Sequence, residues 1–171
     1  GTDNQEHIWT GLSANTFSVL SSDHAAFKYD DVRGKKLPGA DKSFRKIPNG
    51  VPGVETRLPL LFSEGVNKGR ITLQQFVALS STNAAKIYGL HPRKGTIAVG
   101  ADADIVLWDP ERKVDLTNSI LHHNCDYTPY EGRQLTGYPV MTLSRGEVVM
   151  EEGRMSGAAG RGRFQRCDRP G

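Results

Sequence analysis

The spacing of apolar residues changes its period near residue 90, and this change constrains the fold more than any other feature of the sequence. Before it, apolar side chains recur three and four positions apart, which is the spacing of one helix face. After it, residues 94–110 alternate short β-rich runs with glycine turns, and segments 139–143 and 147–150 flank Arg145-Gly146 as in a hairpin. The sequence therefore predicts a helical part with one strand over about residues 1–90, followed by a β-rich part.

Two helices are predicted from apolar spacing in the first part. Gln5 to Asn15 is a short helix with one apolar side, and Val54 to Val66 is a second. Pro59 either kinks the second helix or marks its true start, because proline cannot donate a backbone hydrogen bond inside a helix.

Capping residues predict two further helices. Thr72, with Gln75 three positions on, has the pattern of a capping box, and Ser81 is expected to cap a separate helix. Gly69 and Gly89 are expected to end the helices that precede them.

A short apolar run leads directly into the first candidate for chemistry. Phe17 to Leu20 precedes Ser21-Ser22-Asp23-His24, and a run this short before a carboxylate is typical of a buried strand that ends at a site. Asp23 could ligate a metal, move a proton or simply cap a loop. His24 is interpreted as a packing histidine, because neighbouring residues in a strand point to opposite faces.

The long segment over residues 28–50 is predicted to be a loop that is either functional or disordered. It closes on Ile47-Pro48-Asn49-Gly50, which is typical of a β-turn. In the alternative interpretation, backbone N–H and C=O groups near Asn49 bind a polar ligand.

The remaining histidines and the cysteines suggest no metal centre. Consecutive histidines on a strand diverge, and no zinc-like spacing surrounds His122-His123. His7 and His91 are interpreted as surface and loop residues. Cys125 and Cys167 are far apart in sequence and are expected to be free thiols in a reducing compartment.

Composition narrows the function classes. The 171 residues suit one domain or the remnants of two, and the 37% hydrophobic share is low for a self-sufficient core. A net charge of +3 is no argument for nucleic acid. No apolar stretch approaches the ~20 residues that span a bilayer, and residues 1–6 do not resemble a signal peptide. The arginine-containing tail, residues 151–171, is either solvated or in contact with a subunit.

Several motifs, taken in order along the chain, carry a resemblance to one family. They are Ser22-Asp23-His24, Ile47-Pro48-Asn49-Gly50, Ser81-Thr82-Asn83-Ala84-Ala85-Lys86, Pro92-Arg93-Lys94-Gly95, and Gly100 to Pro110 with Asp102 and Asp104. The chain resembles dihydropyrimidinases and bacterial D-hydantoinases, which are cyclic amidohydrolases. The last motif is shared widely among amidohydrolases, whereas the first two narrow the resemblance to this branch.

The resemblance implies an α/β fold: the C-terminal fragment of a (β/α)8 TIM-barrel metal-dependent hydrolase plus part of a small β-sandwich. Residues 1–90 would be the end of the catalytic barrel, with Phe17 to Leu20 as its last strand. Residues 91–150 would be the C-terminal part of the sandwich, and 151–171 a tail that contacts other subunits.

The resemblance also implies an activity, namely opening of a hydantoin or dihydropyrimidine ring to an N-carbamoyl amino acid. Asp23 would ligate one of two divalent metal ions, usually zinc, and shuttle a proton, while the main chain of Asn49 would bind the cyclic imide or ureide. The other ligands lie upstream in the family and are not found here, so the isolated chain is expected to be inactive. A cytoplasmic homotetramer without nucleic-acid or membrane partners is expected.

Three alternatives stay open. The chain could belong to a non-catalytic scaffold related to dihydropyrimidinase, since fold does not fix function. It could belong to another cyclic amidohydrolase, such as an allantoinase or dihydroorotase, although Ile-Pro-Asn-Gly weighs against this. It could also be a free-standing β-rich interaction module.

Overall fold

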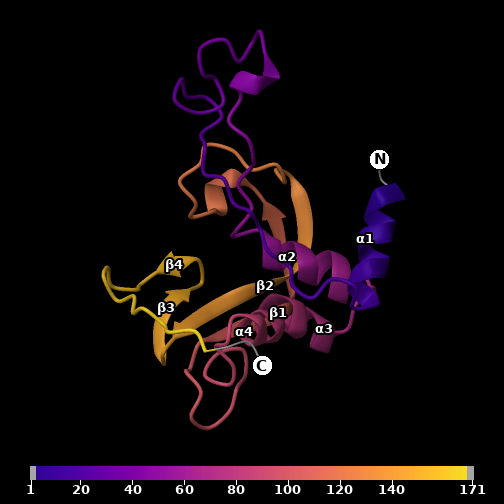
Figure 1. The fold of residues 1–171 in the computed structure, drawn as a ribbon, viewed down its shortest axis with the longest axis vertical. Helices are drawn as coiled ribbons and strands as arrows, with labels where there is room; N and C mark the ends of the chain where they lie inside the picture. The colour runs from indigo at the N-terminus through magenta and orange to yellow at the C-terminus, as the bar shows by residue number, and fades with distance from the viewer. Residues whose placement is uncertain (1–2, 169–171) are drawn as a thin grey trace.

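A computed structural model of the chain describes residues 3–168, with helices in the first half and an antiparallel sheet in the second (Figure 1). The α-helices are α1 (Asp3–Ser13), α2 (Arg57–Leu61), α3 (Leu73–Val77) and α4 (Asn83–Ile87). Short 3-10 turns lie at Phe44–Lys46 and Asn118–Ile120, and π-helical turns lie at Phe62–Val66 and Ala78–Thr82. The strands are β1 (Ile105–Leu116), β2 (Arg133–Ser144), β3 (Glu147–Glu151) and β4 (Arg154–Met155).

The two helices expected from apolar spacing are present with shifted bounds. The first begins earlier than predicted, at Asp3, and buries Leu12 against the core. The second begins at Arg57 and continues from α2 into the π-helical turn that ends at Val66. Pro59 is the third residue of α2, where the missing N–H is not needed, so it lies near the true start of the helix.

The segment from α3 to α4 is one helical run, which contradicts the expected break at Ser81. Thr72 and Gln75 form the predicted reciprocal capping box, with the Gln75 N–H donating to the Thr72 hydroxyl. Thr82, immediately before α4, has right-handed helical backbone angles and makes no side-chain cap bond. Ser81 does not cap, because the chain passes through it as a π-helical turn.

The prediction of a buried strand over Phe17–Leu20 is wrong for the described residues. Phe17 is 44% exposed, and the segment makes no ladder of strand hydrogen bonds. Its backbone instead meets a helical turn, where the Leu20 N–H donates to the Leu79 carbonyl (3.0 Å). An apolar run needs a neighbouring strand to become a strand itself, and the middle of a helical run lies beside this one.

The sheet has the order β1-β2-β3-β4, and all neighbours are antiparallel. Ser144 pairs with Glu147 across a two-residue turn in which Arg145 and Gly146 both have positive φ, so the predicted hairpin is confirmed. The β-rich prediction for residues 94–104 is wrong, because the first strand begins only at Ile105. That preceding stretch is an irregular loop.

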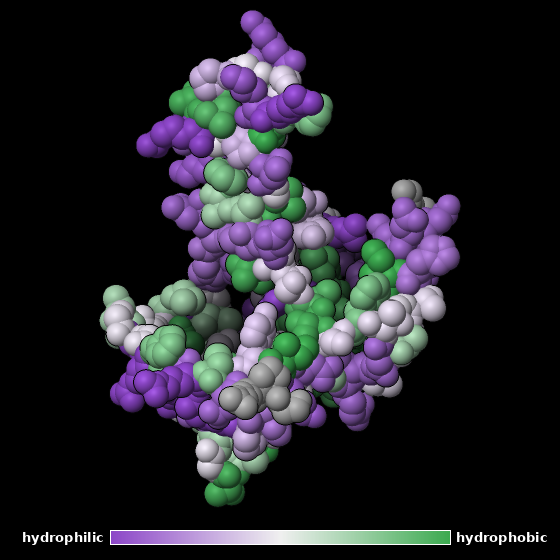
Figure 2. All heavy atoms as spheres, viewed as in Figure 1, coloured by the Kyte–Doolittle hydropathy of each residue, from purple (hydrophilic) through white to green (hydrophobic). Residues whose placement is uncertain are grey.

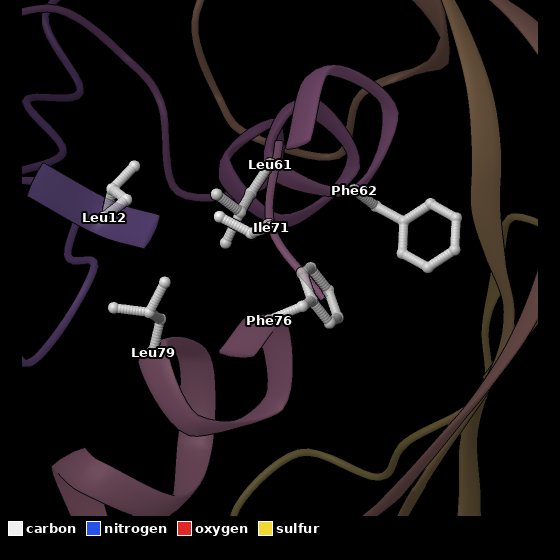
Figure 3. Packing of buried hydrophobic residues seen from close by; sticks show 6 residues of the cluster. All are labelled: Leu12, Leu61, Phe62, Ile71, Phe76 and Leu79. Carbon is white, nitrogen blue, oxygen red and sulfur yellow. The ribbon is translucent and has the colours of Figure 1, made fainter. Parts of the chain in front are cut away.

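A hydrophobic cluster joins the helices to the sheet (Figure 3). Its buried members are Leu12, Leu61, Phe62, Ile71, Phe76 and Leu79. Trp108 of β1 packs its ring against Phe62 at 4.9 Å and against Phe76 at 5.6 Å between centroids. Gly137 of β2 permits this packing, because an added Cβ would lie 2.3 Å from the Phe62 ring.

Residues 28–50 extend away from this core at the top of Figure 1 and contain no helix or strand other than the 3-10 turn at Phe44–Lys46. Figure 2 shows hydrophilic atoms with hydrophobic patches between them over this projecting segment. The prediction of a long loop is confirmed. In the described range 3–168, no helix combines the length and apolar character needed to cross a membrane.

Candidate active site

Asp23 lies on an irregular segment at the base of the projecting loop. Its backbone is left-handed, with φ 46°, a conformation that aspartate tolerates better than most residues but that is rare outside glycine. The side chain is exposed, and its carboxylate forms no hydrogen bond or ion pair with the described residues. A carboxylate held on strained backbone with its oxygens free is available to bind a cation or to exchange a proton.

His24 packs between neighbouring segments, as predicted. Its Nδ1 accepts hydrogen bonds from the N–H groups of Gly53 (3.0 Å) and Val54 (3.3 Å). Its ring meets that of His123 edge to face, with centroids 6.2 Å apart. Because its Nδ1 accepts both of these hydrogen bonds, His24 connects the segment that contains Asp23 to residues 53–54, which follow Asn49 in the chain.

The segment around Asn49, whose backbone is the predicted ligand-binding element, lies beside the segment that contains Asp23. The Ala25 N–H donates to the carbonyl of Val51 (3.1 Å), which joins the two segments directly. Gly50 has φ 85°, and a Cβ there would lie 2.6 Å from the Ala25 Cβ, so the backbones approach closely only because the residue is glycine. Asn49 is exposed on this loop, on the segment adjacent to that of Asp23.

The predicted β-turn at Pro48–Gly50 is not present: residues 48–50 are irregular and contain no hydrogen-bonded turn. The loop is held instead by Lys35, whose Nζ donates to the carbonyls of Pro48 and Gly50. The peptide groups of Asn49 itself make no hydrogen bonds with the described residues. They therefore remain available to a ligand.

A cavity of about 350 Å³ is lined in part by the same two segments. Ser21 and Ser22 line it from one segment, and Val51 and Pro52 line it from the other. Neither Asp23 nor Asn49 lines it. The cavity is thus adjacent to the candidate residues but is formed by different side chains.

The adjacent histidines His122 and His123 lie in a loop rather than on the strand that the sequence analysis assumed for them. His122 donates its N–H to Glu55 Oε2 (2.7 Å), and its Nδ1 lies 2.7 Å from Glu55 Oε1. The Glu55 carboxylate, followed by the Gly153 carbonyl, raises the pKa of His122 above its usual range. In residues 3–168, no group of three His, Cys, Asp or Glu side chains is placed to hold a metal ion.

Sequence reasoning missed two residues that position the loop. Asp126 accepts the backbone N–H groups of Tyr29 (2.6 Å) and Asp30 (2.9 Å), and these bonds lower the pKa of its carboxyl. Lys35 holds the other end of the loop, as described above. Asp126 lies more than 90 positions from its partners, and Lys35 lies 13 and 15 positions from its own. Neither separation follows a helix or strand period, so no sequence pattern predicts these contacts.

Two curated relatives match nearly the whole chain, and a profile of the amidohydrolase family matches residues 2–149. A D-hydantoinase of Rhizobium radiobacter is 46% identical over 162 residues, which cover 95% of this chain and 34% of the relative. A D-phenylhydantoinase of Escherichia coli O1:K1 is 43% identical over the same shares. The chain therefore spans about a third of the length of these relatives.

The fold agrees with solved structures of the same kind. The D-hydantoinase of Bacillus sp. AR9 is 48% identical, with a TM-score of 0.87 over 92% of this chain and 34% of that one. The dihydropyrimidinase of Brevibacillus agri NCHU1002 is 44% identical, with a TM-score of 0.86 over 92% of this chain and 33% of the other. The α/β arrangement described above is thus that of hydantoinase structures.

Proposed function

Because this chain belongs to the amidohydrolase family, we propose that it supplies part of the active site of an enzyme that hydrolyses a cyclic amide. The proposed substrate class is a hydantoin or dihydropyrimidine ring, opened to an N-carbamoyl amino acid. The names of its relatives, D-hydantoinase and D-phenylhydantoinase, support this choice. One observation carries it furthest: the free carboxylate of Asp23 lies on a segment hydrogen-bonded to the Asn49 loop.

Family membership implies divalent metal ions, which when bound polarise the reacting carbonyl and make water a better nucleophile. Asp23 fits one ligand position of such a site, because its exposed carboxylate has no other partner among the described residues. Two ions, with zinc as the metal, are our proposal. In residues 3–168 no three His, Cys, Asp or Glu side chains are grouped to hold a metal ion, whereas zinc sites use three or four ligands, so we expect this chain by itself to be inactive.

The role proposed for Asp23 is proton transfer. Its carboxylate would accept a proton from the attacking water and then donate it to the ring nitrogen as the C–N bond breaks. A positioned acid–base group of this kind contributes about 10²–10⁴-fold in rate. The free peptide groups of Asn49 would orient the ring N–H and C=O beside it, which lowers the entropic part of the barrier.

Substitution of Asp23 tests this function. In an enzyme of the relatives' full length, Asp23→Asn should lower kcat by about 10²-fold or more. Asn49→Ala should have a smaller effect, because the proposed contact is made by the main chain. Turnover of hydantoin by Asp23→Asn within about tenfold of wild type, with metal content unchanged, would remove Asp23 from the mechanism. Absence of any turnover by the unsubstituted enzyme would favour the scaffold alternative.

The remaining features are proposed on the family resemblance. Residues 1–90 would complete a (β/α)8 barrel, residues 91–150 a small β-sandwich, and residues 151–171 would contact neighbouring subunits of a homotetramer. A reducing, cytoplasmic location is supported by Cys125 and Cys167, both of which are free thiols. Sedimentation velocity of the complete enzyme tests the tetramer.

A further inference from the structure

Lys35 differs from the other lysines of the projecting loop in what its charge contacts. Its half-buried Nζ donates to the carbonyl oxygens of Pro48 and Gly50 and lies 5.6 Å from the centroid of the Phe27 ring. It forms no ion pair with a carboxylate of the described residues. Lys36, by contrast, is exposed and pairs with Asp30 at 2.6 Å. The Lys35 ammonium is therefore committed to the loop backbone.

The two carbonyls that Lys35 binds flank Asn49 on either side. A hydrogen bond from a charged donor is shorter and stronger than one between neutral groups, so this ammonium fixes both neighbouring peptide units at once. The peptide groups of Asn49 are left without hydrogen bonds to the described residues. The loop backbone is thus held in one shape while its central residue stays free.

His24 holds the other end of the same backbone. Its Nδ1 accepts from Gly53 and Val54, and the Ala25 N–H donates to Val51. Residues 48–54 are consequently anchored at their start by Lys35 and at their end by the residues next to Asp23. The position of Asn49 relative to Asp23 depends on both anchors.

We propose that Lys35 is a positioning residue for substrate: its ammonium sets the backbone on both sides of Asn49 so that the free peptide groups meet the cyclic amide beside Asp23. This inference rests on the function proposed above. Lys35 does not touch the reacting atoms, so its loss should weaken substrate binding more than it slows the chemical step.

The experiment compares Lys35→Met with Lys36→Met in the full-length enzyme. Both changes replace an ammonium by a neutral side chain of similar length at adjacent positions, but only the first removes the contacts to Pro48 and Gly50. For Lys35→Met, KM should rise by about tenfold or more while kcat stays within about threefold. Lys36→Met should leave both constants unchanged.

Amide hydrogen exchange gives a readout that does not depend on activity. Without substrate, Lys35→Met should speed exchange of the Ala25, Gly53 and Val54 amides, which are hydrogen-bonded between the two segments, by about tenfold, with the core helices unchanged. Lys35→Arg, which retains a cation, should restore much of the protection. Equal exchange of these residues in the Lys35→Met and Lys36→Met proteins would overturn the proposal, and so would a Lys35→Met enzyme with wild-type KM.

A measurement on the unsubstituted protein covers the case in which Lys35→Met does not fold. Lys35 should react with an amine-labelling reagent about tenfold more slowly than Lys36, because its donors are engaged and it is half-buried. Equal labelling rates would contradict the assignment. If Asp23→Asn retained activity while the exchange result held, the proposed mechanism would fail but the anchoring of the loop by Lys35 would stand.

Discussion

His122 shows how one side chain connects segments that are distant in the sequence. Its ring lies between the Glu55 carboxylate and the Gly153 carbonyl (2.8 Å), so a doubly protonated imidazole satisfies both acceptors. Other charged and titratable groups nearby are Tyr138, whose pKa is raised by burial and then by Glu55, and the ion pair of Arg112 with Glu152. Through His122, the residues that precede α2 are connected to the turn between β3 and β4.

The stability of the protein should therefore depend on pH through His122. Because its folded pKa is raised, its stabilising contribution is fully present below the unfolded value of about 6.5 and is lost as the pH rises through the folded pKa. Thermal melts between pH 6 and pH 9 should show a larger decrease in Tm for the wild type than for His122→Gln. Identical pH profiles, or an NMR titration of His122 at or below the ordinary value, would contradict this expectation.

At the scale of elements, the run from α3 to α4 depends on its first cap rather than on Ser81. The Thr72 backbone N–H donates to the Gln75 side chain (2.9 Å), and the Gln75 N–H donates to the Thr72 hydroxyl (3.2 Å). These reciprocal bonds satisfy donors that a helix leaves free at its start. The π-helical turn at Ala78–Thr82 then carries the helix past the expected break.

Removal of this cap gives a quantitative test. Thr72→Ala should lower the free energy of unfolding by about 1 kcal/mol, measured by urea denaturation followed by circular dichroism. Ser81→Ala is the matched control and should change it by less than about 0.5 kcal/mol, because Ser81 is exposed and makes no cap. A larger loss for Ser81→Ala would restore the sequence expectation of two separate helices.

At the scale of the whole molecule, one apolar cluster holds the helices and the sheet together. Leu79 is 1% exposed within it, and its carbonyl also accepts from Leu20. Trp108 brings β1 into the same cluster through Phe62 and Phe76. A change at the centre of this cluster should therefore destabilise both parts of the chain.

Two leucines of the same helical run make a matched comparison of burial. Leu79→Ala should cost about 2–5 kcal/mol of unfolding free energy, because it leaves a cavity in the core. Leu73→Ala, at a position 53% exposed, should cost less than about 1 kcal/mol. Chemical denaturation measures both, and equal losses would show that the cluster does not have the packing described.

Local features were predictable because their causes lie within a few residues. The capping box at Thr72, the helix end at Gly89 and the hairpin at Arg145-Gly146 each depend on hydrogen bonds or backbone angles of neighbours in the sequence. The candidates Asp23 and Asn49 came from motifs that can be read directly, and their functional roles remain proposals.

The sequence by itself thus determined the helix start after Thr72, the chain turn at Arg145-Gly146, and which side chains have the chemistry for a site. Only the tertiary structure decided that Phe17–Leu20 lies against the π-helical turn at Ala78–Thr82, that Lys35 holds the loop on both sides of Asn49, and that His122 contacts Glu55. The physical reason is distance along the chain: each of these contacts joins residues at least 13 positions apart, and no local spacing encodes a contact of that kind.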